Sequence, residues 1–527
     1  MISPTIDWAA LTPLLLVLGA AVLSVLVEAF MPARFRRSVQ IVFTLTALVG
    51  AFIATMWRVT VVSTEGPAPV VSGGRTQGAL GTFAEDMPAL MFQAAILVCA
   101  FFAVLVMADR TLTGEGAFAA SAATQPGSLD EREATEAGLV QTEVFPLSLF
   151  AVGGMLAFAS ANDLLTLFIA LEVLSLPLYV LCATARRRRA LSQEAAIKYF
   201  LLGAFSSAFF LMGAALLYGY AGSVGYAAIV DTASSSVGMD ALLIAGFSLV
   251  LVGLLFKVGA APFHSWTPDT YQGAPTPVTG FMAAGTKIAA FAAMLRFAYV
   301  VGNAVQWEMA PVLWTVIIAT MLVGTVGGIV QKDIKRMLAY SSIAHAGFVL
   351  IGVGSYTSTA IASVAFYLLA YGLASVGAFA VITLVRQRDA EGNVLGEATL
   401  IEQWRGLGRS NPVLAGAMAI FLLSFAGIPL TGGFIGKYLV FASGVHGGEA
   451  VLVVLAVLAS AATAFFYFRL IHTMFLRDGD GHQRVTVVES EGYSSVAIGA
   501  CAIGTLLLGI VPGPVMNFLG EAVKFML

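Results

Sequence analysis

Eight ionisable residues lie inside stretches of sequence that are otherwise apolar. They are Lys198, Lys257, Lys287, Arg296, Lys437, Arg469, Glu172 and His345. A charged side chain near the middle of a lipid bilayer costs about 2.5–3.5 kcal/mol or more, so it requires a partner, a water-filled cavity or a function. Burial disfavours a charged lysine and a nearby carboxylate favours it, so a set of such groups can exchange protons when a neighbouring charge moves. The pattern predicts a path for protons.

Two of the lysines stand beside predicted breaks in helices. Lys257 precedes Pro262 in the run LVGLLFKVGAAPFHSW, and Lys437 follows Pro429 in LLSFAGIPLTGGFIGKYLVFA. Proline removes a backbone hydrogen bond, and non-helical backbone at membrane depth is tolerated only where it is buried in protein or lines water. Either lysine could instead extend to the membrane surface. The adjacent breaks favour an ion site at both positions.

Glu172 and Lys287 lie farther from the ends of their apolar runs. Glu172 is about nine residues into DLLTLFIALEVLSLPLYVL, where an unpaired carboxylate would take up a proton, so a lysine partner is expected. A purely structural ion pair is the alternative. Lys287 lies in the middle of GFMAAGTKIAAFAAMLRF, which favours a role in proton transfer.

The remaining ionisable residues are more ambiguous. Lys198 is about five residues inside its apolar run and could reach the surface. His345 could equally be a proton carrier or a hydrogen-bonded residue of the core. Arg296 and Arg469 lie nearer the helix ends and are interpreted as structural.

The composition places the chain among α-helical membrane proteins. Of its 527 residues 59% are hydrophobic and only 11% are charged, whereas a soluble domain has about 25% charged residues. Most apolar runs have roughly the 17–25 residues that cross a bilayer as a helix. The alternating ten-residue pattern of a β-barrel is absent. Cys99, Cys182 and Cys501 are far apart and predict no iron–sulfur or zinc site.

Neither nucleic acid nor a cleavable signal peptide is predicted. The sequence has no basic patch with interleaved aromatic residues, and the start MISPTIDWAALTPLLL lacks a basic region. The apolar runs predict an all-α polytopic protein with about fourteen spans. We place them near 8–29, 38–57, 86–108, 144–161, 163–184, 193–219, 240–261, 276–301, 309–330, 337–355, 358–385, 411–443, 448–475 and 493–518.

The distribution of Lys and Arg predicts the orientation. Eighteen of them fall in loops on one side of the predicted bundle, and only Arg58, Arg75 and Lys524 fall on the other. Loops rich in Lys and Arg stay in the cytoplasm. We therefore expect a multi-pass protein of the bacterial inner membrane with both termini outside.

Equivalent features recur at regular spacing along the chain. Lys437 lies 180 residues after Lys257, and His345 lies 173 residues after Glu172, in both cases five spans later. Because five is odd, the second unit would enter the membrane from the opposite side, and broken helices in two inverted halves are typical of an ion path. The expected organisation is three spans plus a flexible cytoplasmic loop at 109–143 (1–143), a first five-helix repeat (144–305), a second (306–475) and a C-terminal span (476–527).

Three motifs resemble a known family, the antiporter-like subunits of respiratory complex I. They are FKVGAAPFHSWTPDTYQGAPTPVTGFMAAGTK at 256–287, QKDIKRMLAYSSIAHAGF at 331–348 and FLLSFAGIPLTGGFIGKY at 421–438. The resemblance spans roughly residues 10–520. It favours the N-type branch over the L and M types for three reasons. YQGAPTPV replaces the sisters' EGPTPVSA, Lys437 stands where the M type has glutamate, and a long C-terminal lateral helix is lacking.

The resemblance implies roles for individual residues. Glu172 and Lys257 match the paired glutamate and lysine of the first half-channel, Lys287 the central lysine, and Lys437 the lysine of the second half-channel. Lys198 matches a further lysine of the family, and His345 lies in its axis segment. The function implied is proton translocation in an NADH–quinone oxidoreductase.

The resemblance also implies where the redox chemistry takes place. This chain would hold no cofactor, and NADH, FMN, iron–sulfur clusters and quinone would be bound by partner subunits. Its partners would be the other membrane subunits, sister antiporter-like subunits included, and the lipid bilayer. The alternative function is a stand-alone or Mrp-type cation/proton antiporter.

Overall fold

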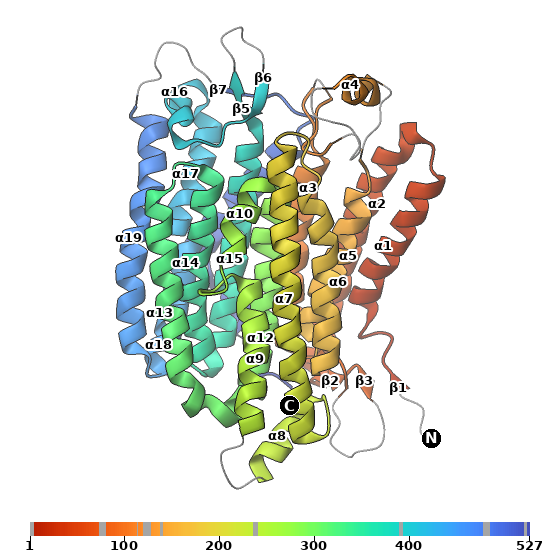
Figure 1. Cartoon of the computed structure of the whole chain (residues 1–527), viewed down its shortest axis with the longest axis vertical. Helices are drawn as coiled ribbons and strands as arrows, with labels where there is room; N and C mark the ends of the chain where they lie inside the picture. The colour runs from red at the N-terminus through yellow and green to blue at the C-terminus, as the bar shows by residue number, and fades with distance from the viewer. Residues whose placement is uncertain are drawn as a thin grey trace.

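The computed structural model is an all-helical bundle with small β-sheets at its two ends (Figure 1). It describes residues 5–72, 81–112, 114–119, 128–136, 141–235, 241–388, 394–477, 485–520 and 524–526. The first half of the chain supplies α1 (Thr12–Phe30), α2 (Ala33–Glu65), α3 (Met87–Ala108), α4 (Leu129–Glu136), α5 (Val144–Ser160), α6 (Leu164–Cys182), α7 (Arg189–Ala221), α8 (Tyr226–Ser235), α9 (Ala241–Val258), α10 (Trp266–Gly273), α11 (Thr276–Phe281), the π-helix η1 (Met282–Thr286) and α12 (Lys287–Val300).

The second half continues with η2 (Gly302–Val305), α13 (Gln306–Val330), α14 (Ile334–Gly354), α15 (Ser358–Leu384), η3 (Ile401–Trp404), α16 (Leu407–Ser410), α17 (Pro412–Ala426), α18 (Gly432–His446), α19 (Ala450–Phe475), α20 (Tyr493–Ile510) and α21 (Gly513–Leu519). The antiparallel sheets pair β1 (Thr5–Ile6) with β3 (Val71–Ser72), β2 (Ala68–Pro69) with β4 (Ala84–Glu85), and β5 (Val385–Arg388) with both β6 (Val394–Glu397) and β7 (Val485–Val487).

Fourteen apolar helical segments match the predicted spans. Within the described residues twelve are long and apolar enough to cross a membrane, and α5 and α17 are shorter apolar helices. The number of actual crossings stays a prediction. Figure 1 places the N- and C-termini at the same end of the bundle, as an even number of crossings requires.

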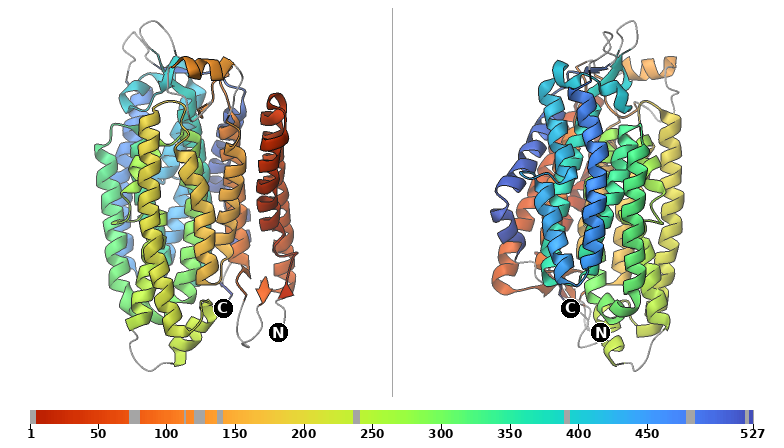
Figure 2. Two further views of the ribbon diagram at one scale, coloured as in Figure 1. Left: turned by 45° about the vertical axis from the view of Figure 1, so that its right-hand side comes forward. Right: turned by 90° about the vertical axis from the view of Figure 1, so that its left-hand side faces the viewer.

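The centre of the bundle is formed by the segment 276–300, which carries Lys287, together with α14 and α15. The apolar windows of 276–300, α14 and α15 are 100%, 89% and 94% buried, whereas those of α1, α7 and α19 are only 28% buried. Helices α1 and α2 stand at one edge, as Figure 2 shows. Their outward faces are apolar, which is what lipid or a neighbouring subunit would contact.

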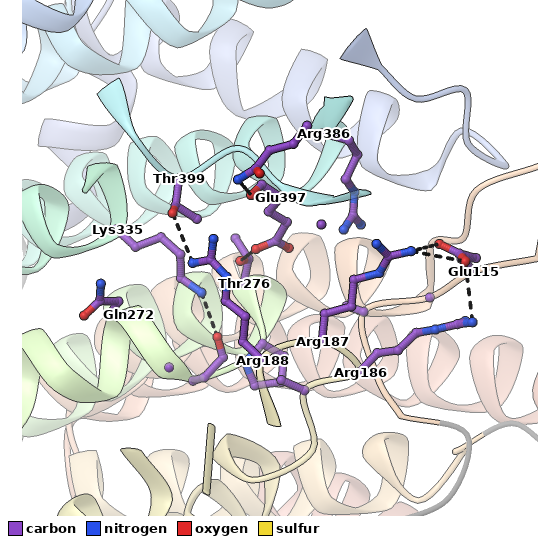
Figure 3. A pocket seen from close by; sticks show the side chains of 18 residues that line it. Glu115, Arg186, Arg187, Arg188, Gln272, Thr276, Lys335, Arg386, Glu397 and Thr399 are labelled. Carbon is purple, nitrogen blue, oxygen red and sulfur yellow. Dashed lines mark hydrogen bonds and ion pairs between the residues drawn. The ribbon is translucent and has the colours of Figure 1, made fainter. Parts of the chain in front are cut away.

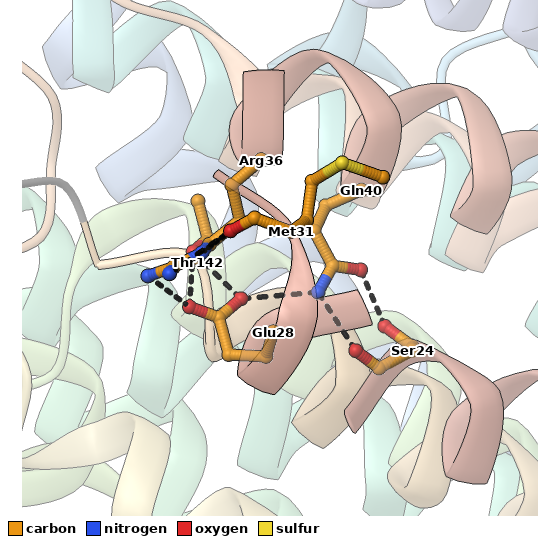
Figure 4. A network of polar contacts seen from close by, with 6 residues as sticks. All are labelled: Ser24, Glu28, Met31, Arg36, Gln40 and Thr142. Atoms are coloured by element: carbon orange, nitrogen blue, oxygen red, sulfur yellow. Dashed lines mark hydrogen bonds and ion pairs between the residues drawn. The ribbon is translucent and has the colours of Figure 1, made fainter. Parts of the chain in front are cut away.

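A polar network ties α1 and α2 to the start of α5. The Glu28 carboxylate accepts hydrogen bonds from Thr142 Oγ1 at 2.7 Å, Gln40 Nε2 at 3.0 Å and Arg36 Nη1 at 3.2 Å. Figure 4 shows these side chains converging on the carboxylate. The Gln40 amide also donates to the Ser24 carbonyl oxygen at 2.9 Å. Each polar group is satisfied, so the network is a structural clamp.

The two broken helices end in the same way. Gly259 follows α9 with φ +75°, and Gly427 follows α17 with φ +80°. One residue further on, the Ala260 amide donates to the Leu255 carbonyl at 2.9 Å and the Ile428 amide to that of Leu423 at 3.0 Å. Glycine in the left-handed conformation with this hydrogen bond is a common helix C-terminus. The predicted break beside Lys257 is present: α9 ends at Val258, and Gly259 is the residue of positive φ that follows it, before Pro262.

Two charged side chains and one segment differ from what the sequence predicted. Arg58 was assigned to an outer loop, but α2 extends past it and its buried guanidinium pairs with Glu85 at 2.5 Å. Lys335, one of the eighteen Lys and Arg counted in the predicted inner loops, is only 3% exposed. The segment 109–143 was expected to be a flexible loop, yet its described parts include α4 and backbone bridges from Thr111 to Ser490 and from Phe118 to Ala185.

The first turn of α6 is held by Asp163, which precedes the helix that carries Glu172. Its carboxylate accepts from the backbone amide and the hydroxyl of Thr166, both at 2.7 Å. We expect Asp163→Ala to destabilise the protein by about 0.5–2 kcal/mol, because two helix donors lose their acceptor. Thermal unfolding of the purified complex measures the loss. Thr166→Val keeps the backbone bond and should cost less; equal costs would contradict this assignment.

Candidate functional site

Lys257 lies at the end of α9 and is 3% exposed. Its Nζ donates to Ser175 Oγ on α6 at 2.7 Å and to Tyr199 OH on α7 at 2.9 Å. It also lies 5.3 Å from the centre of the Tyr199 ring. The ammonium is thus held by hydroxyl groups from two neighbouring helices. Hydroxyl groups both accept and donate, so they can pass a proton on.

Glu172 lies on α6, one turn before Ser175, and is partly exposed. Its carboxylate accepts a hydrogen bond from Ser207 Oγ at 2.6 Å. Among the described residues Glu172 and Lys257 form no ion pair within 4.0 Å, although the glutamate charge acts on the lysine. The two predicted partners are therefore coupled through space. The hydroxyl groups on α6 and α7 occupy the position where a direct ion pair was expected.

Lys287 is the first residue of α12 and directly follows the π-helix η1. It is 3% exposed, and its Nζ donates to the backbone carbonyl of Ser342 on α14. Single-turn π-helices inside α-helices occur frequently at functional sites. The π-turn and Lys287 lie in the segment 276–300, whose apolar window is entirely buried.

His345 lies one turn beyond Ser342 on the same helix and is held between two tyrosines. Its Nδ1 is 2.6 Å from Tyr367 OH on α15, and its Nε2 is 3.1 Å from Tyr467 OH on α19. Tyr467 OH also hydrogen-bonds Ser341 Oγ. A neutral imidazole donates through one nitrogen and accepts through the other, so this chain of groups can transmit a proton.

Lys437 lies on α18 and is 5% exposed. Its Nζ donates to the carbonyl oxygens of Phe425 and Ala426 at 2.8 and 3.0 Å, and to Ser460 Oγ at 2.7 Å. Those two carbonyls are the last of α17, where a helix lacks backbone donors and favours a cation. The break in the helix therefore creates the acceptor site for the lysine that follows it.

The approach of α18 to α17 depends on a glycine. A Cβ atom on Gly433 would collide with the backbone oxygen of Ser424. The Gly433 amide donates instead to Ser424 Oγ at 3.1 Å. This close contact brings Lys437 to the end of α17.

His345 is linked electrostatically to a lysine of each half, Lys287 and Lys437. The charges of both Lys287 and Lys437 act on His345. Helix α14 carries the acceptor of Lys287 and the histidine itself. Lys287 and Lys437 thus lie within electrostatic range of His345, and Glu172 lies within that of Lys257.

Lys198 is not part of this buried set. Its side chain is 42% exposed and pairs with Glu194 at 2.6 Å and with Asp269 at 2.7 Å. Asp269 also pairs with Arg336 at 2.6 Å, so it joins α7, α10 and α14. These contacts fit a structural role at the edge of the broken helix better than a place in the proton path.

We expect Lys198→Ala to reduce coupled turnover by no more than about fivefold. A partly exposed ion pair contributes about 0.2–1 kcal/mol, and Asp269 keeps Arg336 as a partner after the change. NADH oxidation and proton pumping of membrane vesicles measure the effect. A loss as complete as that of a buried lysine would return Lys198 to the proton path.

The two arginines that were interpreted as structural are held by fixed acceptors. The fully buried Arg296 donates through Nη1 and Nη2 to the two carboxylate oxygens of Asp86, both at 2.7 Å. Arg469 donates to the carbonyls of Ile329 and Gln331 at 2.7 and 2.6 Å. Bidentate contacts of this kind fix helix positions, and arginine does not release its proton in proteins.

The hydroxyl partners of the lysines and the histidine were missed by the sequence reasoning. They are Ser175, Tyr199, Tyr367, Ser460 and Tyr467. Serine and tyrosine in an apolar run carry no net charge and resemble ordinary core residues. Periodicity offers one usable signal, since Ser175 lies three residues after Glu172 and so on the same helix face.

Comparison with known proteins assigns the fold and the sequence to one family. The family model described as "NADH:quinone oxidoreductase/Mrp antiporter, TM" matches residues 161–463. The NADH-quinone oxidoreductase subunit N of Beutenbergia cavernae is 57% identical over 532 residues, covering 99% of both chains. That of Acidothermus cellulolyticus is 50% identical over 525 residues, covering 99% of this chain and 97% of the relative.

Several solved structures have the same fold as this chain at lower sequence identity. A chain of respiratory complex I from Thermus thermophilus with bound aureothin is 33% identical, with a TM-score of 0.74 over 97% of this chain and 100% of that one. A chain of the Mrp complex from Dietzia sp. has a TM-score of 0.75 over 97% of both chains at only 20% identity. The second likeness concerns the fold alone. With the matched family model and relatives of 50–57% identity over nearly their whole length, the chain belongs to the NADH:quinone oxidoreductase/Mrp antiporter transmembrane family.

Proposed function

We propose that this chain moves protons along Glu172, Lys257, Lys287, His345 and Lys437. The chain is a membrane subunit of the complex I type, involved in proton translocation alongside other membrane subunits. A charge that moves when quinone is reduced elsewhere in the complex would separate Glu172 from Lys257. Protons would then pass through Lys287 and His345 to Lys437.

One observation carries the proposal. Among the described residues, Lys257, Lys287 and Lys437 are 3–5% exposed, and each donates only to hydroxyl or carbonyl oxygens, with no carboxylate within 4.0 Å. A buried ammonium without a counter-charge is costly, so small changes in the nearby charge can tip it between its two protonation states. A structural ion pair, in contrast, would stabilise the protonated lysine and disfavour release of its proton.

The proposal extends to the rest of the complex and to its placement. The complex acts as a proton-translocating NADH:quinone oxidoreductase, and NADH, FMN, iron–sulfur clusters and quinone bind to partner subunits. The chain lies in the bacterial inner membrane with both termini outside. The shared end of the two termini and the basic loops of the predicted inner side support this orientation (Figure 1).

Deleting the chain from its bacterium and restoring it on a plasmid tests the function. We expect the tagged chain to co-purify with flavin and iron–sulfur subunits, and deletion to abolish NADH-driven proton pumping in inverted vesicles until it is restored. The likeness to the Mrp complex defines the contrary result. If the purified chain alone exchanges sodium for protons in liposomes, and deletion leaves NADH-driven pumping unchanged, it is an antiporter.

A further inference from the structure

A polar cavity of about 190 Å³ lies at the arginine-rich end of the bundle, away from the buried lysines of the proton path. The loop before α7, the start of α14 and the β5–β6 hairpin surround it (Figure 3). A single water needs about 10–15 Å³, so the space accepts a larger group. Nothing in the proton path uses this cavity.

Positive charge is in excess around the cavity. The lining includes five cations and two carboxylates, namely Arg186, Arg187, Arg188, Lys335, Arg386, Glu115 and Glu397. Three positive charges therefore remain without a matching carboxylate. A concave site lined by one sign of charge concentrates ions of the opposite sign.

Both carboxylates are already engaged. Glu115 is bonded by Arg187 Nη2 at 3.1 Å, and Arg186 Nη2 lies 3.5 Å from it. Glu397 accepts from the Thr276 hydroxyl. Arg186 and Arg187 therefore share one carboxylate, and within the described residues no ion pair within 4.0 Å joins Glu397 to Arg188, Lys335 or Arg386.

Lys335 is the most buried of the remaining cations, at 3% exposed. Its Nζ donates to the Ala274 carbonyl at 2.7 Å, and within the described residues no carboxylate lies within 4.0 Å of it. An ammonium has three donors, and this is one of them. The Glu397 and Asp333 carboxylates act on this ammonium from beyond ion-pair distance, and a bound anion would stabilise the buried charge further.

Arg188 and Arg386 complete the unmatched set. Arg188 has φ +57°, a conformation that costs a non-glycine residue about 1–2 kcal/mol, and its Nη1 donates only to Thr399 Oγ1 at 3.2 Å. In the described part of the chain, the Arg386 guanidinium has no hydrogen-bond or ion-pair partner, although it lines the cavity. Figure 3 shows the Arg187 side chain running toward Glu115 and that of Arg188 toward Thr399. The strained residue thus turns one arginine of the run away from its neighbours.

We infer that this cavity binds a phosphate group, with Arg188, Lys335 and Arg386 as its ligands. Guanidinium groups bind phosphate oxygens in pairs, and a buried ammonium adds a point charge. A free phosphate, with a charge of about −1.5 to −2, would offset most of the unmatched positive charge, and a lipid phosphodiester would offset one charge of it. The phosphate is either that of an anionic lipid headgroup or free in solution.

Phosphate binding to the intact, purified complex tests the inference. For the delipidated complex in detergent, the probe is radiolabelled inorganic phosphate. For the complex in nanodiscs, retention of phosphatidylglycerol is compared with that of phosphatidylcholine. Arg386→Gln and Arg188→Gly are compared with wild type. Glycine relieves the positive φ at position 188, so Arg188→Gly removes a ligand without straining the backbone. Arg477→Gln, an exposed arginine paired with Glu402, is the matched control.

We expect each cavity variant to weaken binding by about tenfold or more, because a charge-assisted hydrogen bond is lost, while Arg477→Gln binds as wild type. Saturable binding of inorganic phosphate would identify a soluble ligand. Selective retention of phosphatidylglycerol would identify a lipid. The inference is overturned if wild type binds neither probe, or if the cavity variants bind as well as the control.

Discussion

In a complex that carries Lys437→Met, NADH-driven proton pumping should fall by about 10²-fold or more. Lys437 Nζ is the donor to the last two carbonyls of α17 and to Ser460, and methionine removes both the proton and the donors. Removing a group that transfers a proton typically costs a factor of about 10²–10⁴. Because pumping and electron transfer are coupled, NADH oxidation should fall with it. Quenching of a pH-sensitive dye in inverted vesicles measures the pumping.

A second substitution separates proton transfer from packing. Lys437→Arg keeps a positive charge and donors for the α17 carbonyls, but arginine does not release its proton. We expect Lys437→Arg to assemble and still not to pump. Lys332→Ala, at an exposed lysine outside the path, is the control and should pump normally. Normal pumping by Lys437→Arg would mean that the lysine only holds the helix ends together.

Lys257→Met should have an effect of similar size in the first half of the chain. The substitution removes the only charge held by Ser175 Oγ and Tyr199 OH, and it leaves Glu172 without the cation on which its charge acts. We therefore expect pumping to fall by about 10²-fold or more. Proton uptake by liposomes that contain the purified complex measures it.

The coupling between the two residues can be tested in the same assay. If Glu172 and Lys257 act as one unit, the double variant Glu172→Gln with Lys257→Met should pump about as well as the worse single variant. Glu172→Gln keeps the hydrogen bond from Ser207, so the variant tests charge and leaves the packing in place. Losses that multiply in the double variant would show that the two residues act independently.

The sequence predicted the bundle well because both of its signals are local. Apolar runs marked the helices, and charges inside those runs marked Lys257, Lys287 and Lys437, all of which are buried. The helix breaks were predicted next to the correct lysines from nearby glycine and proline, and the structure has Gly259 and Gly427 in the left-handed conformation there. Many glycines in an apolar run do not adopt positive φ, so the sequence alone does not show which glycine ends a helix when a proline is also near.

The sequence indicates how far a residue lies from the end of its helix, but it does not indicate whether the side of the helix that carries the residue is covered by other helices. Lys198 was assigned to the path only by the family resemblance, and its depth left it able to reach the surface; its side chain is 42% exposed and pairs with Glu194 and Asp269. Lys335 lies near the start of α14 and was assigned to a loop, yet it is buried. Burial near a helix end is decided by what packs over it from elsewhere in the chain.

The hydrogen-bonded links could not be predicted because they join distant parts of the chain. Tyr199 is 58 residues from Lys257, and Tyr467 is 122 residues from His345. Pairing these groups requires the packing of α7 against α9 and of α19 against α14.

The central claim is that one set of buried groups carries protons through both halves, and Lys287 joins the halves. The number of protons pumped per electron pair, measured in liposomes with the purified Lys287→Arg complex, tests it most directly. Arginine keeps the charge and the hydrogen bond to Ser342 but does not release its proton. We predict an assembled complex whose ratio is below that of wild type. An unchanged ratio at normal NADH oxidation would contradict the account.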